Sequence, residues 1–291
     1  MLQFFANGLI AGSVYALIAL GFALIYSTVR FFHFAHGAMY TTGAYLAFTF
    51  FILCEIPFIL SVGIAIFLTA LLGMGIGICV YEPMRRRGAS SFVLLIASLG
   101  LFILLQNLIS LIFGDDVKTI RRGAVQEGYH FLDIRITNIQ IIIIIASLIL
   151  FIITTLVLKH TKIGKALRAV ANDYELAIAA GINTPKVVNF TYFMGSALAA
   201  IAAILISLDL HMTPMMGFNA ILYGIIAMII GGLGNILGAY FGGLFLGLSQ
   251  HLGVVFISSK WQDAIAFSLL IIFLLFRPQG FFGKRIERAQ I

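Results

Sequence analysis

The sequence contains very little charge. Only 10% of its 291 residues are Asp, Glu, Lys or Arg, whereas 62% are hydrophobic and the mean hydropathy is +1.10. Soluble domains carry roughly 25% charged residues, so a soluble fold of this composition could not cover its surface with polar groups. The scarcity of charge excludes a soluble protein with a large apolar core. Lipid must be the solvent for most of the side chains.

The sequence also lacks the alternation of apolar and polar residues that membrane β-strands require over about ten residues. Apolar runs such as 139–145 have no such pattern. We therefore predict an all-α fold, a polytopic membrane helical bundle. The chain has only two cysteines, Cys54 and Cys79, and both lie near or within apolar segments, so they carry no information about the redox compartment.

The apolar segments are long enough to cross a bilayer. A helix rises about 1.5 Å per residue, so a hydrocarbon core of roughly 30 Å needs about 20 apolar residues. Segments of this kind lie near residues 3–28, 35–54, 57–80, 91–113, 137–158, 188–208 and 262–276. The apolar stretch 218–250 is too long for one crossing and is broken by glycines, which predicts two short helices packed back to back. The total is about nine transmembrane helices, with eight or ten also possible.

The first apolar segment does not resemble a signal peptide. It has no basic start, and its apolar run is longer than the roughly 7–15 residues of a signal-peptide core. We expect it to remain in the mature chain.

Basic residues predict the orientation, because Lys and Arg near span ends stay in the cytoplasm. One arrangement puts 13 of the 18 basic and four of the 11 acidic residues inside, for a net charge of +9 inside and −2 outside. It needs nine crossings and places the N-terminus outside, with residues 159–187 and the C-terminus in the cytoplasm. The basic residues placed inside are Arg30, Arg85, Arg86, Arg87, Lys159, Lys162, Lys165, Arg168, Lys186, Arg277, Lys284, Arg285 and Arg288. The excess of basic residues thus reflects orientation and does not indicate nucleic-acid binding.

The longest inside segment is amphipathic. Apolar residues recur at steps of three and four through residues 161–181, which describes one face of an α-helix. The residues of this face are Ile163, Leu167, Val170, Tyr174 and Ile178. Thr161 is a candidate N-cap, and Gly181 suits a left-handed C-terminal cap. So polar a helix must either lie on the inner leaflet or fit a groove on a cytoplasmic partner. Its many small residues favour docking to a partner, because they permit close approach.

Glycines are frequent, with 29 in the chain. Small residues four apart let membrane helices approach closely, and such rows include Gly8–Gly12, Gly73–Gly77 and Gly243–Gly247. The cluster 231–238 is different because it interrupts an apolar segment. Broken backbone at membrane depth must be buried in protein or line a water-filled path. Transporters use such breaks beside substrate pathways, and we favour a pathway for this cluster.

The predicted spans contain no catalytic or ion-coupling chemistry. Glu55, Asp209 and Asp263 lie at span ends, which argues against a proton or sodium symporter. No phosphate-binding loop is present, because Gly164-Lys165 and Gly283-Lys284 lack the preceding glycine and the following Ser or Thr. The chain is therefore not expected to hydrolyse ATP.

No metal or cofactor is predicted. His33 and His36 lie three residues apart without a carboxylate or Cys nearby, so we interpret them as hydrogen-bonding residues at a helix end. The pair Asp115-Asp116 is interpreted as solvated surface.

Several motifs occur in order along nearly the whole chain and resemble one permease family. They are Asn7-Gly8 with Gly12-Ser13-Val14-Tyr15-Ala16-Leu17, Phe34-Ala35-His36-Gly37, Gly43-Ala44-Tyr45, Ile163-Gly164-Lys165-Ala166-Leu167-Arg168-Ala169, Ala179-Ala180-Gly181-Ile182-Asn183, Gly231-Gly232-Leu233-Gly234-Asn235, Gly238-Ala239 and Arg277-Pro278-Gln279-Gly280. The chain is similar to branched-chain amino-acid ABC transporter permeases of the LivH-like family.

The resemblance implies that residues 1–291 form a single permease domain of an importer in the cell inner membrane. It implies as partners a second homologous, LivM-like permease, two cytoplasmic ABC ATPase subunits and a periplasmic substrate-binding protein. The amphipathic helix would be the coupling helix, with Gly164, Ala169, Asn172, Glu175, Ala177 and Gly181 as candidates for ATPase contact. Candidates for the translocation pathway are Phe34, His36, Gly37, Tyr45, Gly231, Gly232, Gly234 and Asn235.

Three residues depart from the family pattern. His33 stands where relatives commonly have Asn, Glu82 where a basic residue is usual, and Leu237 where many relatives have Pro. The first could alter substrate preference and the third the bend of the span. Alternative functions keep the architecture with urea, amides or sugars as cargo, or make the chain an ion-coupled carrier.

Overall fold

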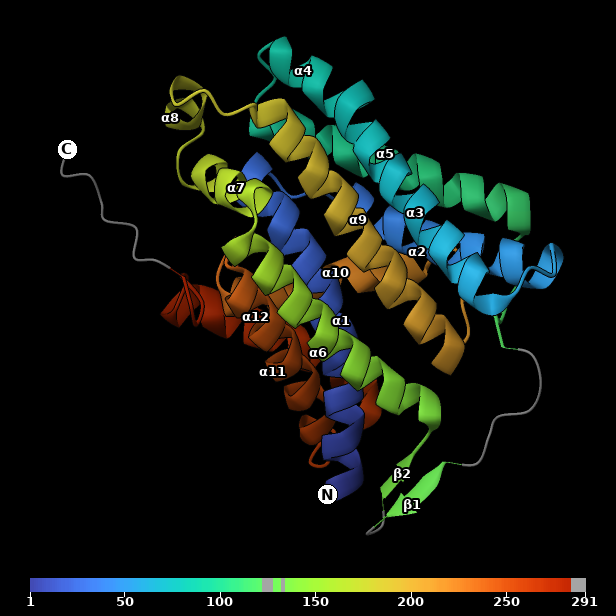
Figure 1. Ribbon diagram of the computed structural model, residues 1–291. Helices are drawn as coiled ribbons and strands as arrows, with labels where there is room; N and C mark the ends of the chain where they lie inside the picture. Colours follow the sequence, from blue (N-terminus) through green and yellow to red (C-terminus); the bar gives the residue numbers. More distant parts are fainter. Residues whose placement is uncertain (122–127, 132–133, 284–291) are drawn as a thin grey trace.

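The chain is a bundle of helices (Figure 1). The computed structural model describes residues 1–121, 128–131 and 134–283. The helices are α1 (Leu2–Val29), α2 (Ala35–Phe48), α3 (Phe58–Ile76), α4 (Glu82–Arg86), α5 (Ser91–Phe113), α6 (Asn138–His160), α7 (Lys162–Asn172), α8 (Tyr174–Ala179), α9 (Thr184–Asp209), α10 (Met216–Gly231), α11 (Ile236–Gly253) and α12 (Gln262–Phe276). Short π-helical turns, Thr49–Leu53 and Gly77–Tyr81, continue α2 and α3, and a 3₁₀ turn, Ser259–Trp261, precedes α12. The predicted cytoplasmic tail, with Lys284, Arg285 and Arg288, lies outside the described residues.

The apolar helices confirm a multi-pass, all-α membrane protein. In the described part of the chain, six helices are long and apolar enough to cross a membrane, or seven if the bent pair α10–α11 counts as one span. The predicted number of about nine is not confirmed. One predicted span, 35–54, begins with α2, which has only 14 residues and starts beside Phe102, a residue from the middle of α5.

The predicted pair of short helices within 218–250 is confirmed. The axes of α10 and α11 differ by 116° across the break. Gly231 and Gly238 face each other so closely that a Cβ on Gly231 would lie 2.0 Å from the Gly238 carbonyl oxygen. The two helices therefore pack back to back through their glycines.

Glycine rows also set the contact between α1 and α11. A Cβ on Gly247 would lie 2.3 Å from the backbone nitrogen of Gly12, and one on Gly8 would lie 2.9 Å from the Cα of Leu248. Two backbones can approach this closely only where the residue is glycine, which has no Cβ. The structure therefore confirms that the rows Gly8–Gly12 and Gly243–Gly247 are packing surfaces, and it pairs them with each other.

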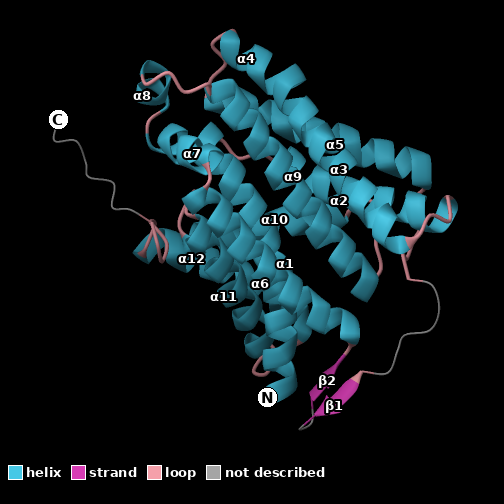
Figure 2. Cartoon of the chain, in the orientation of Figure 1, coloured by secondary structure: helices cyan, strands magenta, loops and turns pink. Residues whose placement is uncertain are grey.

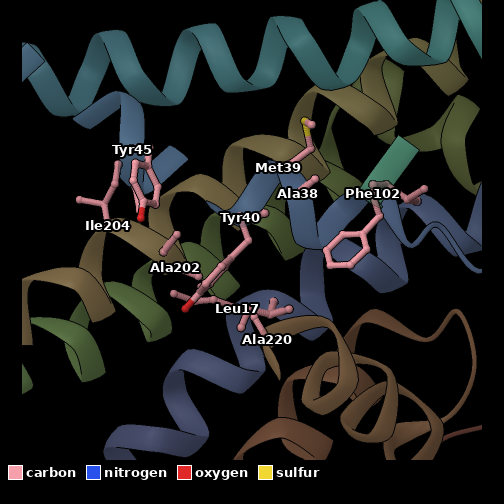
Figure 3. Close-up of a cluster of buried hydrophobic side chains, with 14 of the residues drawn as sticks. Leu17, Ala38, Met39, Tyr40, Tyr45, Phe102, Ala202, Ile204 and Ala220 are labelled. Carbon is pink, nitrogen blue, oxygen red and sulfur yellow. The ribbon is translucent and has the colours of Figure 1, made fainter. Parts of the chain in front are cut away.

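The core forms where α1, α2, α9 and α10 meet. Figure 3 shows Leu17, Tyr40, Ala202 and Ala220 converging from these four helices. Leu17 and Ala202 are fully buried, and Tyr40 and Ala220 are nearly so. Small side chains from α9 and α10 leave room for the Tyr40 ring, so one large residue fills the space between four helices.

The two ends of the bundle differ in their contacts. At one end, here called the basic end, Arg30 donates to the carbonyl of Ala171 and Arg85 donates to the carbonyl of Val29 over 3.1 Å. At the opposite end, here called the hairpin end, the amide of Arg135 donates to Gln3 over 2.7 Å. Segments that the charge pattern predicted to share a side of the membrane therefore lie together. Figure 1 shows α4, α7 and α8 at one end and the N-terminus with the strands at the other.

Two local predictions need correction. The predicted single helix over 161–181 is two helices, α7 and α8, because Asp173 adopts extended backbone angles of φ −149° and ψ 113°. A short antiparallel hairpin, β1 (Tyr129–Phe131) with β2 (Ile134–Ile136), was not predicted (Figure 2). It lies between α5 and α6 in a segment too short to show strand periodicity.

Candidate docking segment and pathway

The helix α7 is fixed to the bundle by its apolar face. The Thr161 hydroxyl accepts a hydrogen bond from the Gly164 amide over 3.0 Å, which confirms the predicted N-cap. Leu167 and Val170 are 1% and 3% exposed and pack in a cluster with Leu24 and Leu158 of α1 and α6. The polar face of α7 is therefore turned away from the bundle.

The helix α8 begins anew after Asp173. The Asp173 carboxylate accepts a hydrogen bond from the Leu176 amide over 3.0 Å, which is the N-cap geometry that starts a helix. The helix ends before Gly181, whose φ of +78° confirms the predicted left-handed cap. The extended residue turns the chain, so α8 follows a course separate from that of α7 (Figure 1).

The candidate coupling residues divide by burial. Asn172, Glu175 and Gly181 are exposed, and Ala169 is half-buried. Gly164 and Ala177 are buried within the chain itself. A Cβ on Gly164 would lie 2.3 Å from the Val157 carbonyl oxygen, so this glycine lets α7 start close against α6.

Two apolar side chains of α8 are exposed beside these polar residues. Leu176 and Ile178 are 64% and 52% exposed. The amphipathic spacing did not single out Leu176, and it assigned Ile178 to the face shared with Leu167 and Val170. The break at Asp173 changes the phase of the helix, which is why the periodicity over 161–181 overlooked Leu176 and put Ile178 on the buried face.

The pathway candidates at the start of α2 lie inside the bundle. His36, Gly37 and Tyr45 are buried, and Phe34 is half-buried with its amide donating to the Ser98 hydroxyl over 3.1 Å. A Cβ on Gly37 would lie 2.6 Å from the carbonyl oxygen of Gly217. The first turns of α2 and α10 therefore meet in the interior.

The other pathway candidates lie far from this point. Gly231, Gly232, Gly234 and Asn235 form the turn at the opposite end of α10, about 21 Å from Gly217 for fourteen helical residues. The structure does not bring the two groups of pathway candidates together.

The glycine break is closed by the segment that follows α12. Phe281 and Phe282 donate their amides to the carbonyls of Ile230 and Gly231 over 2.8 and 2.9 Å. The Asn235 side-chain amide donates to the Phe282 carbonyl over 2.8 Å. The backbone of the break therefore finds its hydrogen bonds within the protein, which favours burial over a water-filled path at this turn.

The histidine pair occupies an aromatic cluster. The His33 ring lies 5.2 Å from the ring of Tyr81 and 5.3 Å from that of Tyr192, both edge to face. Neither His33 nitrogen has a hydrogen-bond partner among the described residues, so the predicted helix-end hydrogen bond is wrong for His33. No three His, Cys, Asp or Glu side chains in the described ranges gather as metal ligands do.

The chain was compared with known proteins. The family model described as branched-chain amino acid transport system / permease component matches residues 4–274. The high-affinity branched-chain amino acid transport system permease protein BraD of Pseudomonas aeruginosa is 34% identical, over 97% of this chain and 96% of its own. LivH of Escherichia coli, a permease protein of the same kind of system, is 33% identical over the same shares.

A more distant relative is the ribose import permease protein RbsC of Haemophilus influenzae. It is 27% identical over 89% of this chain and 80% of its own. The family model runs from the first turn of α1 to the last turn of α12, and it spans every motif quoted above except the last, Arg277-Pro278-Gln279-Gly280, which lies beyond its end. The chain belongs to the family of branched-chain amino acid transport permease components.

Proposed function

We propose that residues 1–291 form one permease domain of an ATP-binding cassette importer that moves branched-chain amino acids across the cell inner membrane. Membership of the permease family and the apolar helices support this function. ATP hydrolysis is assigned to separate cytoplasmic subunits. A second, LivM-like permease and a periplasmic binding protein complete the proposed assembly, by analogy with the family.

The observation that carries the coupling role is the exposed surface of α8. Leu176 and Ile178 present apolar surface next to Asn172 and Glu175 at the basic end. A short helix with exposed apolar residues and a polar rim fits a groove on a protein partner. We place the ATPase contact on Ala169, Asn172, Glu175 and Gly181 and leave Gly164 and Ala177 to packing within the chain.

The basic end also determines the proposed orientation of the chain in the membrane. The basic end holds Arg30, Arg85 and α7, so the positive-inside rule assigns it to the cytoplasm. Residues 159–187 and the C-terminus are then cytoplasmic, and the β1–β2 hairpin faces the periplasm. The pathway is proposed to open where α2 and α10 begin, at Phe34, His36 and Gly37, with Tyr45 further along α2.

Uptake of labelled leucine by cells expressing the complete transporter tests the coupling role. We expect Glu175→Arg to abolish uptake while the amount of permease in the membrane is unchanged, because Glu175 is exposed and its loss removes no packing. Gly181→Val should act in the same way, because a φ of +78° disfavours a β-branched residue.

The matched control is Asp116→Arg, which makes the same charge change at an exposed residue of the hairpin end. Normal uptake in both the Glu175 and the Gly181 variants contradicts the assignment of α8 to coupling.

A further inference from the structure

A cavity of about 320 Å³ opens at the basic end, between the end of α3, α4, α8 and α9. Its size falls within the range of small-molecule sites, which begins at roughly 300 Å³. Its lining includes Tyr81, Glu82, Arg85, Tyr174, Asn189 and Tyr192. None of them belongs to the coupling or pathway residues discussed above.

Aromatic rings form one wall of this cavity. The rings of Tyr81 and Tyr192 stack with centroids 5.6 Å apart. Tyr81 is 3% exposed, and its hydroxyl has no hydrogen-bond partner among the described residues. A buried hydroxyl without a partner is unfavourable, so a ligand that bonds to this hydroxyl is stabilised there.

The rim of the cavity carries both signs of charge. The guanidinium of Arg85 lies 5.8 Å from the ring centroid of Tyr174 and donates one hydrogen bond, to Val29. An arginine has five N–H donors, so Arg85 retains donors for a carboxylate. Glu82 forms an ion pair with Arg86, whose side chain is 74% exposed. Ion pairs with so exposed a partner contribute little stability, so another cation can replace Arg86 beside Glu82.

These features select a zwitterion. A simple anion would be repelled by Glu82, and a simple cation would be repelled by Arg85 and Arg86. A ligand with a carboxylate, an ammonium group and an apolar side chain satisfies the arginine, the glutamate and the tyrosine wall together. A free apolar amino acid has this combination.

We propose that the cavity binds a free amino acid with an apolar side chain, its carboxylate on Arg85 and its ammonium group on Glu82. That this ligand is also the transported amino acid rests on the proposed function. Tyr174 is the first residue of α8, whereas Arg85 lies in α4. Both residues line the cavity, so a ligand that fills it touches α8 as well as α4 and restrains α8. Amino acid accumulated in the cytoplasm then slows further import.

Binding of leucine to the purified full-length permease in detergent tests the site. We expect Glu82→Gln to weaken leucine binding at least tenfold in a titration calorimeter. Arg87→Gln is the matched control, because Arg87 is exposed in the same turn and does not line the cavity. It should bind leucine within twofold of the unaltered chain.

A second measurement does not depend on the Glu82 variant folding. In a chain with Cys54 and Cys79 replaced by Ser, an Asn189→Cys substitution places a thiol in the cavity wall. Leucine should slow its reaction with a maleimide at least fivefold, and glycerol at the same concentration should not. Equal labelling with and without leucine, or equal binding by the Glu82→Gln and unaltered chains, overturns the proposal. Phospholipid as the sole occupant of the cavity gives that same negative result.

The regulatory role is measured in vesicles that contain the complete transporter. The readout is the ratio of uptake into leucine-loaded vesicles to uptake into empty ones. We expect a ratio well below one for the unaltered chain and near one for Glu82→Gln; equal ratios contradict the regulatory role. A permease that binds leucine at the cavity but transports none contradicts the proposed function and leaves the binding site standing.

Discussion

Two regions of the molecule differ in what their small and apolar residues do: the contact between α1 and α11, and the segment α7–α8. The first pair brings two backbones together through glycines, with Gly12 and Gly247 in direct apposition. The second exposes Leu176 and Ile178 on a helix of six residues. In lipid, close packing supplies most of the attraction between helices. The α1–α11 contact therefore stabilises the bundle, whereas the α8 surface is available to a partner.

The largest effect is expected from filling the α1–α11 contact. Gly247→Leu places a side chain where even a Cβ would lie 2.3 Å from the Gly12 nitrogen, so the helices must separate. Overpacking costs about 1–3 kcal/mol or more, and we expect the permease to be degraded or to aggregate in detergent. Size-exclusion chromatography of the extracted protein measures this. Gly100→Leu is the control, because, apart from the backbone of its own helix and its chain neighbours, no atom of the described residues lies within 4 Å of a Cβ at Gly100.

A smaller effect is expected at the turn between α10 and α11. Asn235→Ala removes both the N-cap of α11 and the bond to the Phe282 carbonyl. Loss of an N-cap costs about 0.5–2 kcal/mol, so the melting temperature in detergent should fall by several degrees. Asn107→Ala provides the comparison, because among the described residues the Asn107 side chain bonds only to the Ile103 carbonyl of its own helix. Equal melting temperatures for the two variants would show that the turn does not depend on Asn235.

The smallest effect on stability is expected on α8. Leu176→Ser should change the free energy of unfolding by no more than about 0.5 kcal/mol, because Leu176 is 64% exposed, so the melting temperature should stay nearly the same. Uptake by the complete transporter should nevertheless fall, since the apolar surface is lost. Val170→Ser, on the buried face of α7, should lower the melting temperature. If Leu176→Ser is as destabilising as Val170→Ser, the two regions do not differ as described.

Much of the fold could be predicted from the sequence because single residues carry strong local preferences. Thr161 and Gly181 marked the two ends of the amphipathic segment, and the glycine rows marked packing surfaces. Their partners could not be predicted, since many glycine rows are compatible with one another. Only tertiary structure pairs Gly12 with Gly247, or Gly231 with Gly238.

The site was harder to predict because it depends on contacts between distant segments. The break at Asp173 defeated the helical periodicity, since an Asp can continue a helix or cap a new one. The closure of the glycine break by Phe281 and Phe282 joins residues about fifty positions apart. The cavity beside Tyr81 and Tyr192 likewise has no local signal, because its walls come from four elements.

The side of the membrane on which α8 lies tests the account most directly. In a chain with Cys54 and Cys79 replaced by Ser, Glu175→Cys introduces one exposed thiol in α8. A membrane-impermeant maleimide should label it in inside-out vesicles and leave it unlabelled in intact spheroplasts. Asp116→Cys, at the hairpin end, should show the reverse. Labelling of the Glu175→Cys thiol in intact spheroplasts would put α8 outside the cell and contradict ATPase docking there.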